Sequence, residues 1–191
     1  MKIRIGFLAL MLAISLFLTR SLFTLGLLLA VLTHEIGHIL MAFACEIRLR
    51  ECTVGIYGAG LTPEHGLYSY EKEILLCLAG PLFNFFLGSI GLVVSLSHPS
   101  ELLEYFSLSS FILGTLNLLP IRDFDGGRIL LSLFTILFGP VTAERIQNIL
   151  SFLFVFLLWS FSLYLLLCHA ASLSLFIFSL SLFVRIFIPE A

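Results

Sequence analysis

Charged residues are scarce in this chain of 191 residues. Asp, Glu, Lys and Arg make up 12% of the sequence, whereas 60% of it is hydrophobic and the mean hydropathy is +1.12. A soluble domain carries about 25% charged residues. The composition therefore excludes an ordinary soluble protein and predicts that a lipid bilayer surrounds much of the chain. Because the net charge is only -2, we expect no nucleic acid or other polyanion as a partner.

The sequence also lacks a cysteine framework, a cleavable leader and internal repeats. Its 4 cysteines form no C-x-x-C pair, so a disulfide scaffold is not predicted. The first apolar run follows Lys2 and Arg4, but it has no A-x-A-like cleavage site and ends at Arg20. We therefore expect a retained first span rather than a signal peptide, and no soluble domain before or after the spans.

Long uncharged stretches predict an all-α integral membrane protein with about six transmembrane helices. About 20 helical residues cross a bilayer. The predicted spans are Ile5–Thr19, Ser21–Thr33 with a continuation to Ala44, Ile74–Ser97, Tyr105–Ile121, Ile146–Cys168 and Ala170–Val184. Ile129–Phe138 is too short to cross and is predicted to be a partly embedded helix. The glycine-rich stretch Arg48–Tyr70 is predicted to form a short β-hairpin or loop at the membrane surface.

The positive charges predict the orientation of these spans. If the N-terminus is cytoplasmic and six spans alternate, only Arg20 falls on the outer side. The positive residues that then fall inside are Lys2, Arg4, Arg48, Arg50, Lys72, Arg122, Arg128, Arg145 and Arg185. This bias agrees with the positive-inside rule. We therefore expect a multi-pass protein with both its N- and C-termini in the cytoplasm.

The motif that carries chemistry is His34-Glu35-Ile36-Gly37-His38, which fits the pattern H-E-x-x-H. Histidines four positions apart lie on one face of a helix, so both imidazoles can bind one metal ion. The glutamate beside the first histidine can then take a proton from the attacking water. These residues predict a metal site with His34 and His38 as ligands and Glu35 as the general base.

The setting of this motif strengthens the metal hypothesis. An ionisable residue at the centre of a membrane span costs roughly 2.5–3.5 kcal/mol on insertion scales. A divalent cation bound by the two imidazoles offsets that cost. The alternative is a satisfied polar cluster at a contact between two helices, without any metal.

A catalytic zinc ion usually has three protein ligands and one open position. The segment from Asn117 to Arg128 contains Pro120, which ends a helix, and a Gly-Gly pair that lets the backbone bend beside Asp125. Asp123 lies only two residues earlier. The spacing alone leaves Asp123 and Asp125 as rival candidates for the third ligand.

Taken together, three segments resemble the site-2 protease family of intramembrane zinc metalloproteases, peptidase family M50. They are the H-E-x-x-H motif, Ala79-Gly80-Pro81-Leu82-Phe83-Asn84, and the N-x-x-P-x-x-x-x-D-G pattern that begins at Asn117. The resemblance is greatest to a compact, bacterial, sporulation-protease-like branch. It implies that Zn²⁺ is the cofactor and that Asp125 is the third ligand. It also implies that Asn117 binds or polarises the substrate and that Asn84 supports the site.

The function that this resemblance implies is cleavage of membrane-tethered proteins within or near the bilayer of the bacterial cell membrane. The expected partner is a single-span membrane protein, of which a tethered transcription or sigma factor is one kind. The expected organisation is one metalloprotease domain over 1–191, with a catalytic core at about 21–128 and a C-terminal helical pair at about 146–188. We expect no CBS or PDZ domain.

The alternative function is a non-catalytic metal-binding membrane protein or a transporter. Transporters are commonly built from repeated units with binding sites between them, and this chain has a single compact motif set without a repeat. A non-catalytic scaffold has no use for the glutamate between the two histidines. Both features favour the protease.

Overall fold

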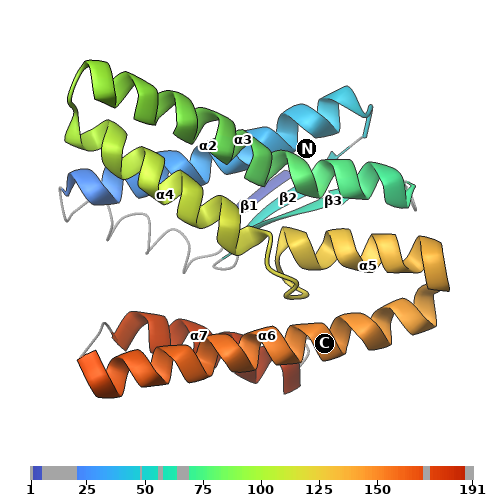
Figure 1. Ribbon diagram of the computed structural model, residues 1–191. Coiled ribbons are helices and arrows are strands. Elements are labelled where there is room, and N and C mark those ends of the chain that lie inside the picture. Colours follow the sequence, from blue (N-terminus) through green and yellow to red (C-terminus); the bar gives the residue numbers. More distant parts are fainter. Residues whose placement is uncertain are drawn as a thin grey trace. The chain divides into compact units, whose positions relative to one another are not determined.

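The computed structural model describes residues 2–5, 21–47, 49–55, 58–63, 69–169 and 173–187. The chain forms two compact units, Met1–Leu118 and Leu119–Ala191, whose helices and strands are labelled in Figure 1. The boundary between the units lies inside the catalytic core predicted at 21–128. A single domain over 1–191 therefore stays a prediction.

In the first unit, three helices pack against one another: α2 (Leu22–Ala44), α3 (Tyr70–Ser97) and α4 (Glu101–Asn117). At two of these helix contacts, a glycine allows the backbones to approach closely. A Cβ atom on Gly26 would lie 2.8 Å from the backbone nitrogen of Phe106, and a Cβ atom on Gly37 would lie 2.7 Å from the carbonyl oxygen of Ala79. Small residues of this kind are typical where membrane helices pack closely.

Helix α3 begins four residues before the predicted span Ile74–Ser97. The hydroxyl of Ser69 accepts a hydrogen bond from the backbone N–H of Lys72 at 3.4 Å and so caps the helix. Glu71 and Glu73 lie in the first turn, where the helix dipole favours negative charge. The charged residues before the apolar run are therefore part of the same helix.

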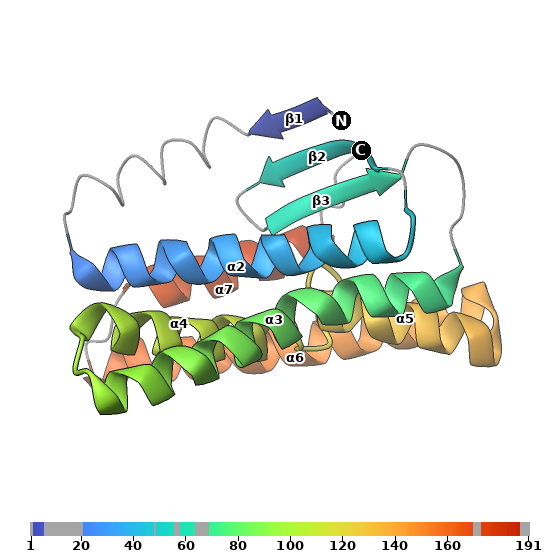
Figure 2. The ribbon, with the colours of Figure 1, turned by 90° about the horizontal axis from the view of Figure 1, so that it is seen from above.

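A three-stranded sheet also belongs to the first unit. Its order is β1 (Lys2–Ile5), β2 (Leu49–Gly55) and β3 (Gly58–Pro63), and Figure 2 shows the three strands side by side. β1 is parallel to β2, whereas β2 and β3 are antiparallel, with Gly55 opposite Gly58. The antiparallel pair lies within the stretch predicted to form a hairpin. Its position at a membrane surface stays a prediction, and β1 was not predicted.

The second unit contains α5 (Asp125–Phe138), α6 (Pro140–His169) and α7 (Leu173–Phe187), with α6 packed against both neighbours. Gly139, with φ of 79°, makes the turn between α5 and α6. The hydroxyls of Ser162 in α6 and Ser179 in α7 share a hydrogen bond of 2.7 Å. The ring of Phe183 in α7 also lies 5.8 Å from that of Trp159 in α6.

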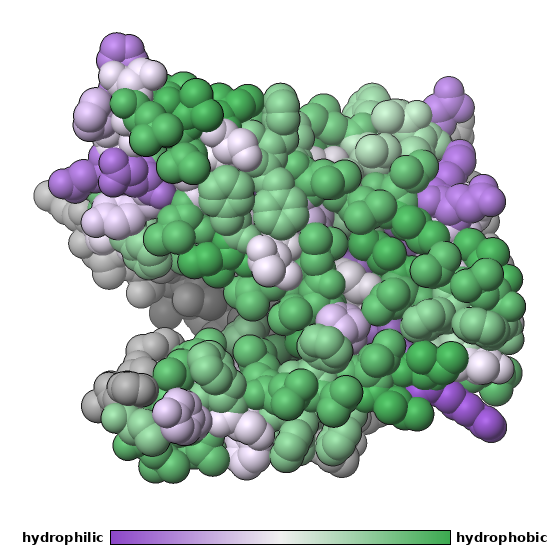
Figure 3. Space-filling model, in the orientation of Figure 1, coloured by the Kyte–Doolittle hydropathy of each residue, from purple (hydrophilic) through white to green (hydrophobic). Residues whose placement is uncertain are grey.

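Within the described part of the chain, three helices are long and apolar enough to cross a membrane: Leu22–Ala44, Tyr70–Ser97 and Pro140–Cys168. Large apolar side chains are exposed on them, and in Figure 3 hydrophobic residues cover most of the visible surface. This pattern fits an integral membrane protein, in which lipid takes the place of water around the helices.

The predicted count of six spans is not confirmed. The predicted span Ile5–Thr19 lies outside the described residues. The expected span Tyr105–Ile121 corresponds to α4, which has 17 residues and ends before Pro120, and Ala170–Val184 corresponds to α7, which has 15 residues. Both are shorter than the roughly 20 residues that cross a bilayer without tilt.

Replacement of Gly88 tests how closely α3 and α4 pack. A Cβ atom on Gly88 would lie 3.0 Å from that of Ser110, whereas the neighbouring residue Ser89 is exposed. We expect Gly88→Leu to force the helices apart, at a cost of about 1–3 kcal/mol for overpacking. Thermal unfolding of the purified protein in detergent should therefore occur several degrees lower for Gly88→Leu than for Ser89→Leu. Equal unfolding temperatures would contradict the close packing.

Candidate metal centre

Helix α2 brings His34 and His38 together. Both side chains are 6% exposed, and their Nε2 atoms lie 3.1 Å apart. The ring centroids are separated by 4.7 Å and the ring planes differ by 85°. The structure thus confirms the helical spacing on which the sequence argument depended, since both imidazoles occupy one face of α2.

This geometry suits a shared metal ion. Two nitrogen ligands, each about 2.0–2.1 Å from a tetrahedral zinc ion, lie roughly 3.3 Å apart. The observed separation of 3.1 Å is close to that value. The two buried imidazoles therefore fit zinc as two of its ligands.

The backbone of α3 fixes the orientation of His38. Its Nδ1 atom lies 2.8 Å from the carbonyl oxygen of Leu76. Because a carbonyl oxygen can only accept, Nδ1 of His38 carries a proton and donates it. In a neutral ring, Nε2 then holds the lone pair that a metal needs, which is the usual arrangement of metal-binding histidines.

A side chain of α3 contacts the other histidine. Nδ2 of Asn84 lies 3.4 Å from Nδ1 of His34, and Oδ1 of Asn84 accepts a hydrogen bond of 3.0 Å from the hydroxyl of Thr33. Asn84 is completely buried, with 0% exposure. Asn84, for which the resemblance implied a supporting role, therefore contacts His34 directly. The contact between Thr33 and Asn84 was not predicted.

Gly80 makes room for the two imidazoles. A Cβ atom at this position would collide with Nε2 of His38 and would lie 2.8 Å from Cε1 of His34. Only a residue without a side chain allows the rings to approach α3 so closely. This requirement explains why the Ala79–Asn84 segment has a glycine at position 80. The sequence alone did not explain it.

Glu35 follows His34 on α2 and is partly buried. Consecutive helical residues are rotated by about 100°, so its side chain leaves the helix beside the histidine face rather than on it. That placement is compatible with a base that acts next to the metal rather than binding it.

Asp125 lies in the second unit, at the first residue of α5, and is 8% exposed. Its carboxylate is at the helix N-terminus, where negative charge is favourable. A Cβ atom on Gly127 would collide with the carbonyl oxygen of Ile121 and lie 2.9 Å from Cα of Arg122. A glycine at position 127 is therefore needed for the close approach of the preceding loop to the start of α5.

Side chains of α6 hold this loop. The backbone N–H of Arg122 donates to the hydroxyl of Ser151 at 2.9 Å, and Nε2 of Gln147 donates to the carbonyl oxygen of Pro120 at 3.3 Å. Gln147 is 1% exposed. These contacts were not predicted, because Gln147 and Ser151 lie inside the predicted span Ile146–Cys168.

The structure separates the two rival aspartates. Asp123 forms an ion pair with Nε of Arg185 at 3.3 Å, and both side chains are 29% exposed. Asp125 is buried by comparison. A buried carboxylate is the stronger candidate for a metal ligand, so the difference in burial favours Asp125.

Asn117 is the last residue of α4, and its side-chain amide donates to the carbonyl oxygen of Leu113 at 3.1 Å. This bond is a local contact within one helix. A role of Asn117 in binding substrate stays a prediction.

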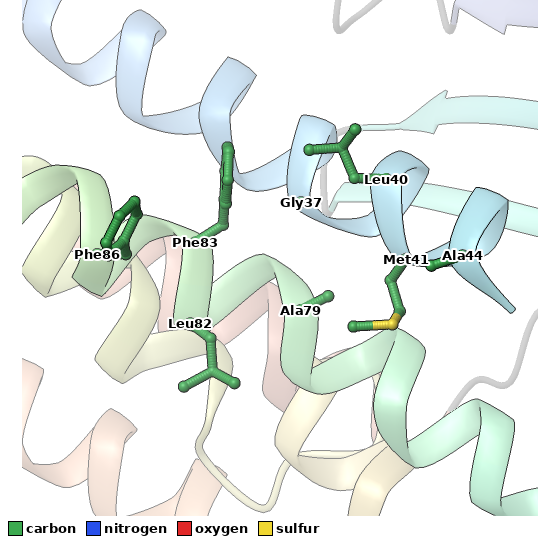
Figure 4. Close-up of a pocket in the computed structure, with 8 residues that line it drawn as sticks. All are labelled: Gly37, Leu40, Met41, Ala44, Ala79, Leu82, Phe83 and Phe86. Atoms are coloured by element: carbon green, nitrogen blue, oxygen red, sulfur yellow. The ribbon is translucent and has the colours of Figure 1, made fainter.

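An apolar groove of about 410 Å³ lies between α2 and α3, as Figure 4 shows. Its walls include Leu40 and Met41 from α2 and Leu82, Phe83 and Phe86 from α3. The two histidines and Glu35 are not part of its lining. The groove is therefore separate from the polar side of the same helix contact.

Comparisons with known proteins agree with the motifs. Residues 94–161 match the model of peptidase family M50. Stage IV sporulation protein FB of Bacillus subtilis (strain 168) is 31% identical over 166 residues, which cover 83% of this chain and 57% of that protein. A zinc metalloprotease of Methanocaldococcus jannaschii is 28% identical over 130 residues, which cover 63% of this chain and 36% of that protein. The chain thus spans less than two thirds of either relative.

The fold also matches that of a solved protein structure. The solved structure of the site-2 protease from Methanocaldococcus jannaschii matches with a TM-score of 0.73 at 23% identity, over 100% of this chain and 92% of that chain. The family match, the curated relatives and the three motifs agree. This chain is therefore similar to peptidase family M50 in sequence and to a site-2 protease in fold.

Proposed function

We propose that this chain is an intramembrane zinc metalloprotease that hydrolyses peptide bonds of membrane-tethered proteins within or near the bilayer. The observation that carries the proposal is the pair of buried imidazoles of His34 and His38, whose Nε2 atoms converge to 3.1 Å with Glu35 beside them. Ionisable residues within a membrane span are costly and commonly mark a functional site. The names of its curated relatives include a zinc metalloprotease.

Asp125 is the proposed third ligand. Its burial, its place at the start of α5 and the ion pair that occupies Asp123 support this choice. Two imidazoles and one carboxylate form a ligand set that suits zinc and leaves one position open. This set also explains why the loop before α5 is anchored so firmly to α6.

A zinc ion held by these residues would supply Lewis acidity, which would polarise a carbonyl group and lower the pKa of a water molecule. Glu35 takes the proton from the attacking water and returns it to the nitrogen of the leaving amine. Asn117, after a change of its side-chain rotamer, donates its amide N–H to the substrate backbone or to the developing oxyanion.

The proposed substrate is a single-span membrane protein, with a tethered transcription or sigma factor as one kind. A substrate helix hides its carbonyl groups in backbone hydrogen bonds, so it must unwind locally before attack. The outer edge of the β2–β3 pair offers backbone groups that can hold the unwound segment as an added strand. We further propose six spans in a bacterial cell membrane, with both termini and the entrance for water on the cytoplasmic side.

Replacement of Glu35 tests the general base. Glu35→Gln removes the proton acceptor but leaves the imidazoles in place, so zinc content should stay unchanged. Cleavage should fall by at least about 100-fold, the lower end of what general base catalysis contributes. Membrane proteomes of cells carrying Glu35→Gln should accumulate an uncleaved single-span protein. The matched control is Glu101→Gln, which alters an exposed carboxylate at the start of α4.

Two outcomes would count against this assignment. Normal turnover by Glu35→Gln would exclude Glu35 as the base. Accumulation of the same protein in the Glu101→Gln control would show that the effect does not depend on the metal centre. Zinc content, measured by elemental analysis of the purified protein, separates loss of chemistry from loss of metal.

A pair of neighbouring substitutions tests the third ligand. We expect Asp125→Asn to weaken zinc binding by more than the roughly 10–100-fold that the loss of an outer hydrogen bond costs. Asp123→Asn removes only an exposed ion pair with Arg185 and should bind zinc as the parent does. Affinity can be measured by competition with a chromogenic chelator. If Asp123→Asn were the weaker binder, the ligand assignment would be reversed.

A further inference from the structure

Two polar side chains lie on the buried face of α6. Four residues spaced by four positions share this face, and each is at most 3% exposed: Ala143, Gln147, Ser151 and Val155. α6 is also one of the helices that are long and apolar enough to cross a membrane. A buried polar group is costly unless it makes hydrogen bonds. The glutamine and the serine therefore need partners, and the loop before α5 supplies them.

The hydrogen bonds of these two side chains form one consistent set. The hydroxyl of Ser151 accepts from the backbone N–H of Arg122 at 2.9 Å and donates to the carbonyl oxygen of Pro120 at 3.4 Å. Nε2 of Gln147 donates to the same carbonyl oxygen and to Oγ of Ser151, each at 3.3 Å. The reverse orientation of the amide would place Oε1 against a carbonyl oxygen, and two acceptors cannot form a hydrogen bond. Gln147 and Ser151 thus hold one donor and one acceptor of the loop backbone.

Gln147 contributes to this arrangement through its nitrogen alone. Its Oε1 atom is buried and has no hydrogen-bond partner within the described part of the chain. An unpaired buried acceptor is unfavourable, and a leucine of similar size would avoid it. Glutamine is therefore a poor choice for packing alone, so its use lies in the loop that Nε2 holds in place.

The start of α5 depends on this loop for its position. The N-cap residue of α5 is Phe124, which makes no side-chain capping bond. Its backbone N–H instead donates to the carbonyl oxygen of Ile121 at 2.9 Å, and the same carbonyl group leaves no room for a Cβ atom on Gly127. Ile121 and Phe124 are buried. A displacement of the loop would therefore be transmitted to the first turn of α5, which begins at Asp125.

We propose that Gln147 and Ser151 are positioning residues that set the place of the Asp125 carboxylate. They act through the backbone of Pro120 and Arg122 and contact neither metal nor substrate. The inference rests on the proposed function, because it takes Asp125 as a zinc ligand. A metal ligand must lie within about 0.2 Å of its proper distance, so a small shift of the start of α5 is enough to weaken zinc binding.

Substitutions of two serines on α6 test this role. Ser151→Ala removes the acceptor of the Arg122 N–H, and the full-length protein in detergent should bind Zn²⁺ about 10-fold more weakly than the parent, the lower end of the loss for an outer hydrogen-bond partner. Ser151→Thr keeps the hydroxyl and should bind more tightly than Ser151→Ala. The matched control is Ser162→Ala, because Ser162 is similarly buried on the same helix but bonds to Ser179 in α7. Competition with a chromogenic chelator measures each affinity.

A combination with Asp125→Asn shows whether the serine acts through the aspartate. If it does, Ser151→Ala should weaken zinc binding in the parent but cause little further loss in Asp125→Asn, where the carboxylate is already absent. Equal losses in both backgrounds would indicate general disruption, and an unchanged affinity in the parent background would exclude any effect on the metal. Either result would overturn the inference while the parent still binds zinc. Failure of the parent itself to bind Zn²⁺ would instead overturn the proposed function, and the inference with it.

Hydrogen exchange tests the anchoring of the loop without any metal. Backbone amides of residues 119–127 should exchange faster in Gln147→Leu and Ser151→Ala than in the parent, because a released loop opens more often. Asn148→Leu is the control, since it removes only an exposed contact with the guanidinium group of Arg122. Mass spectrometry of peptides from the zinc-free, full-length protein measures these rates. Unchanged exchange in both α6 variants would show that the loop keeps its place without them and would contradict the positioning role.

Discussion

The close contact between α2 and α3 is the interaction on which the proposed metal centre depends. Leu76, Gly80 and Asn84 are spaced by four residues on α3, so they form a line along one helix face. The first presents a carbonyl oxygen, the second leaves a gap, and the third presents an amide to the histidines. Helix packing therefore also determines the positions of the two imidazoles. The close contact that leaves no room for a side chain at Gly80 also brings α3 close enough to contact Nδ1 of each histidine.

The sequence predicted the proximity of His34 and His38, but not the contacts that surround them. H-E-x-x-H is a local pattern, and four-residue spacing on a helix is sufficient to place His34 beside His38. The choice between Asp123 and Asp125 was beyond spacing alone. The ion pair of Asp123 with Arg185, which lies far along the chain, is a difference between the two aspartates that spacing cannot reveal. The contact of Thr33 with Asn84 is equally non-local, since it joins two different helices.

The helices could be predicted from the length of the apolar runs, whereas the pairing of the strands could not be predicted. α2 and α3 lie close to the predicted spans, because long uncharged runs specify helices in lipid. Lys2–Ile5 alternates polar and apolar residues, which is a strand signal, yet four residues before an apolar run are easily taken for a charged flank. That they pair with β2, which begins at Leu49, follows from long-range contacts that no local pattern reveals.

The two histidines differ in whether a mutation can remove the group that contacts their Nδ1 atom. Leu76 contributes a main-chain oxygen, and since every amino acid has one, a coding change at that position cannot delete the acceptor of His38. The partner of His34 is a side chain, which a single nucleotide change can remove or convert into a carboxylate. Mutational robustness is therefore built into one of the two proposed ligands. The other is the natural place for evolution or an engineer to adjust how firmly an ion would be held.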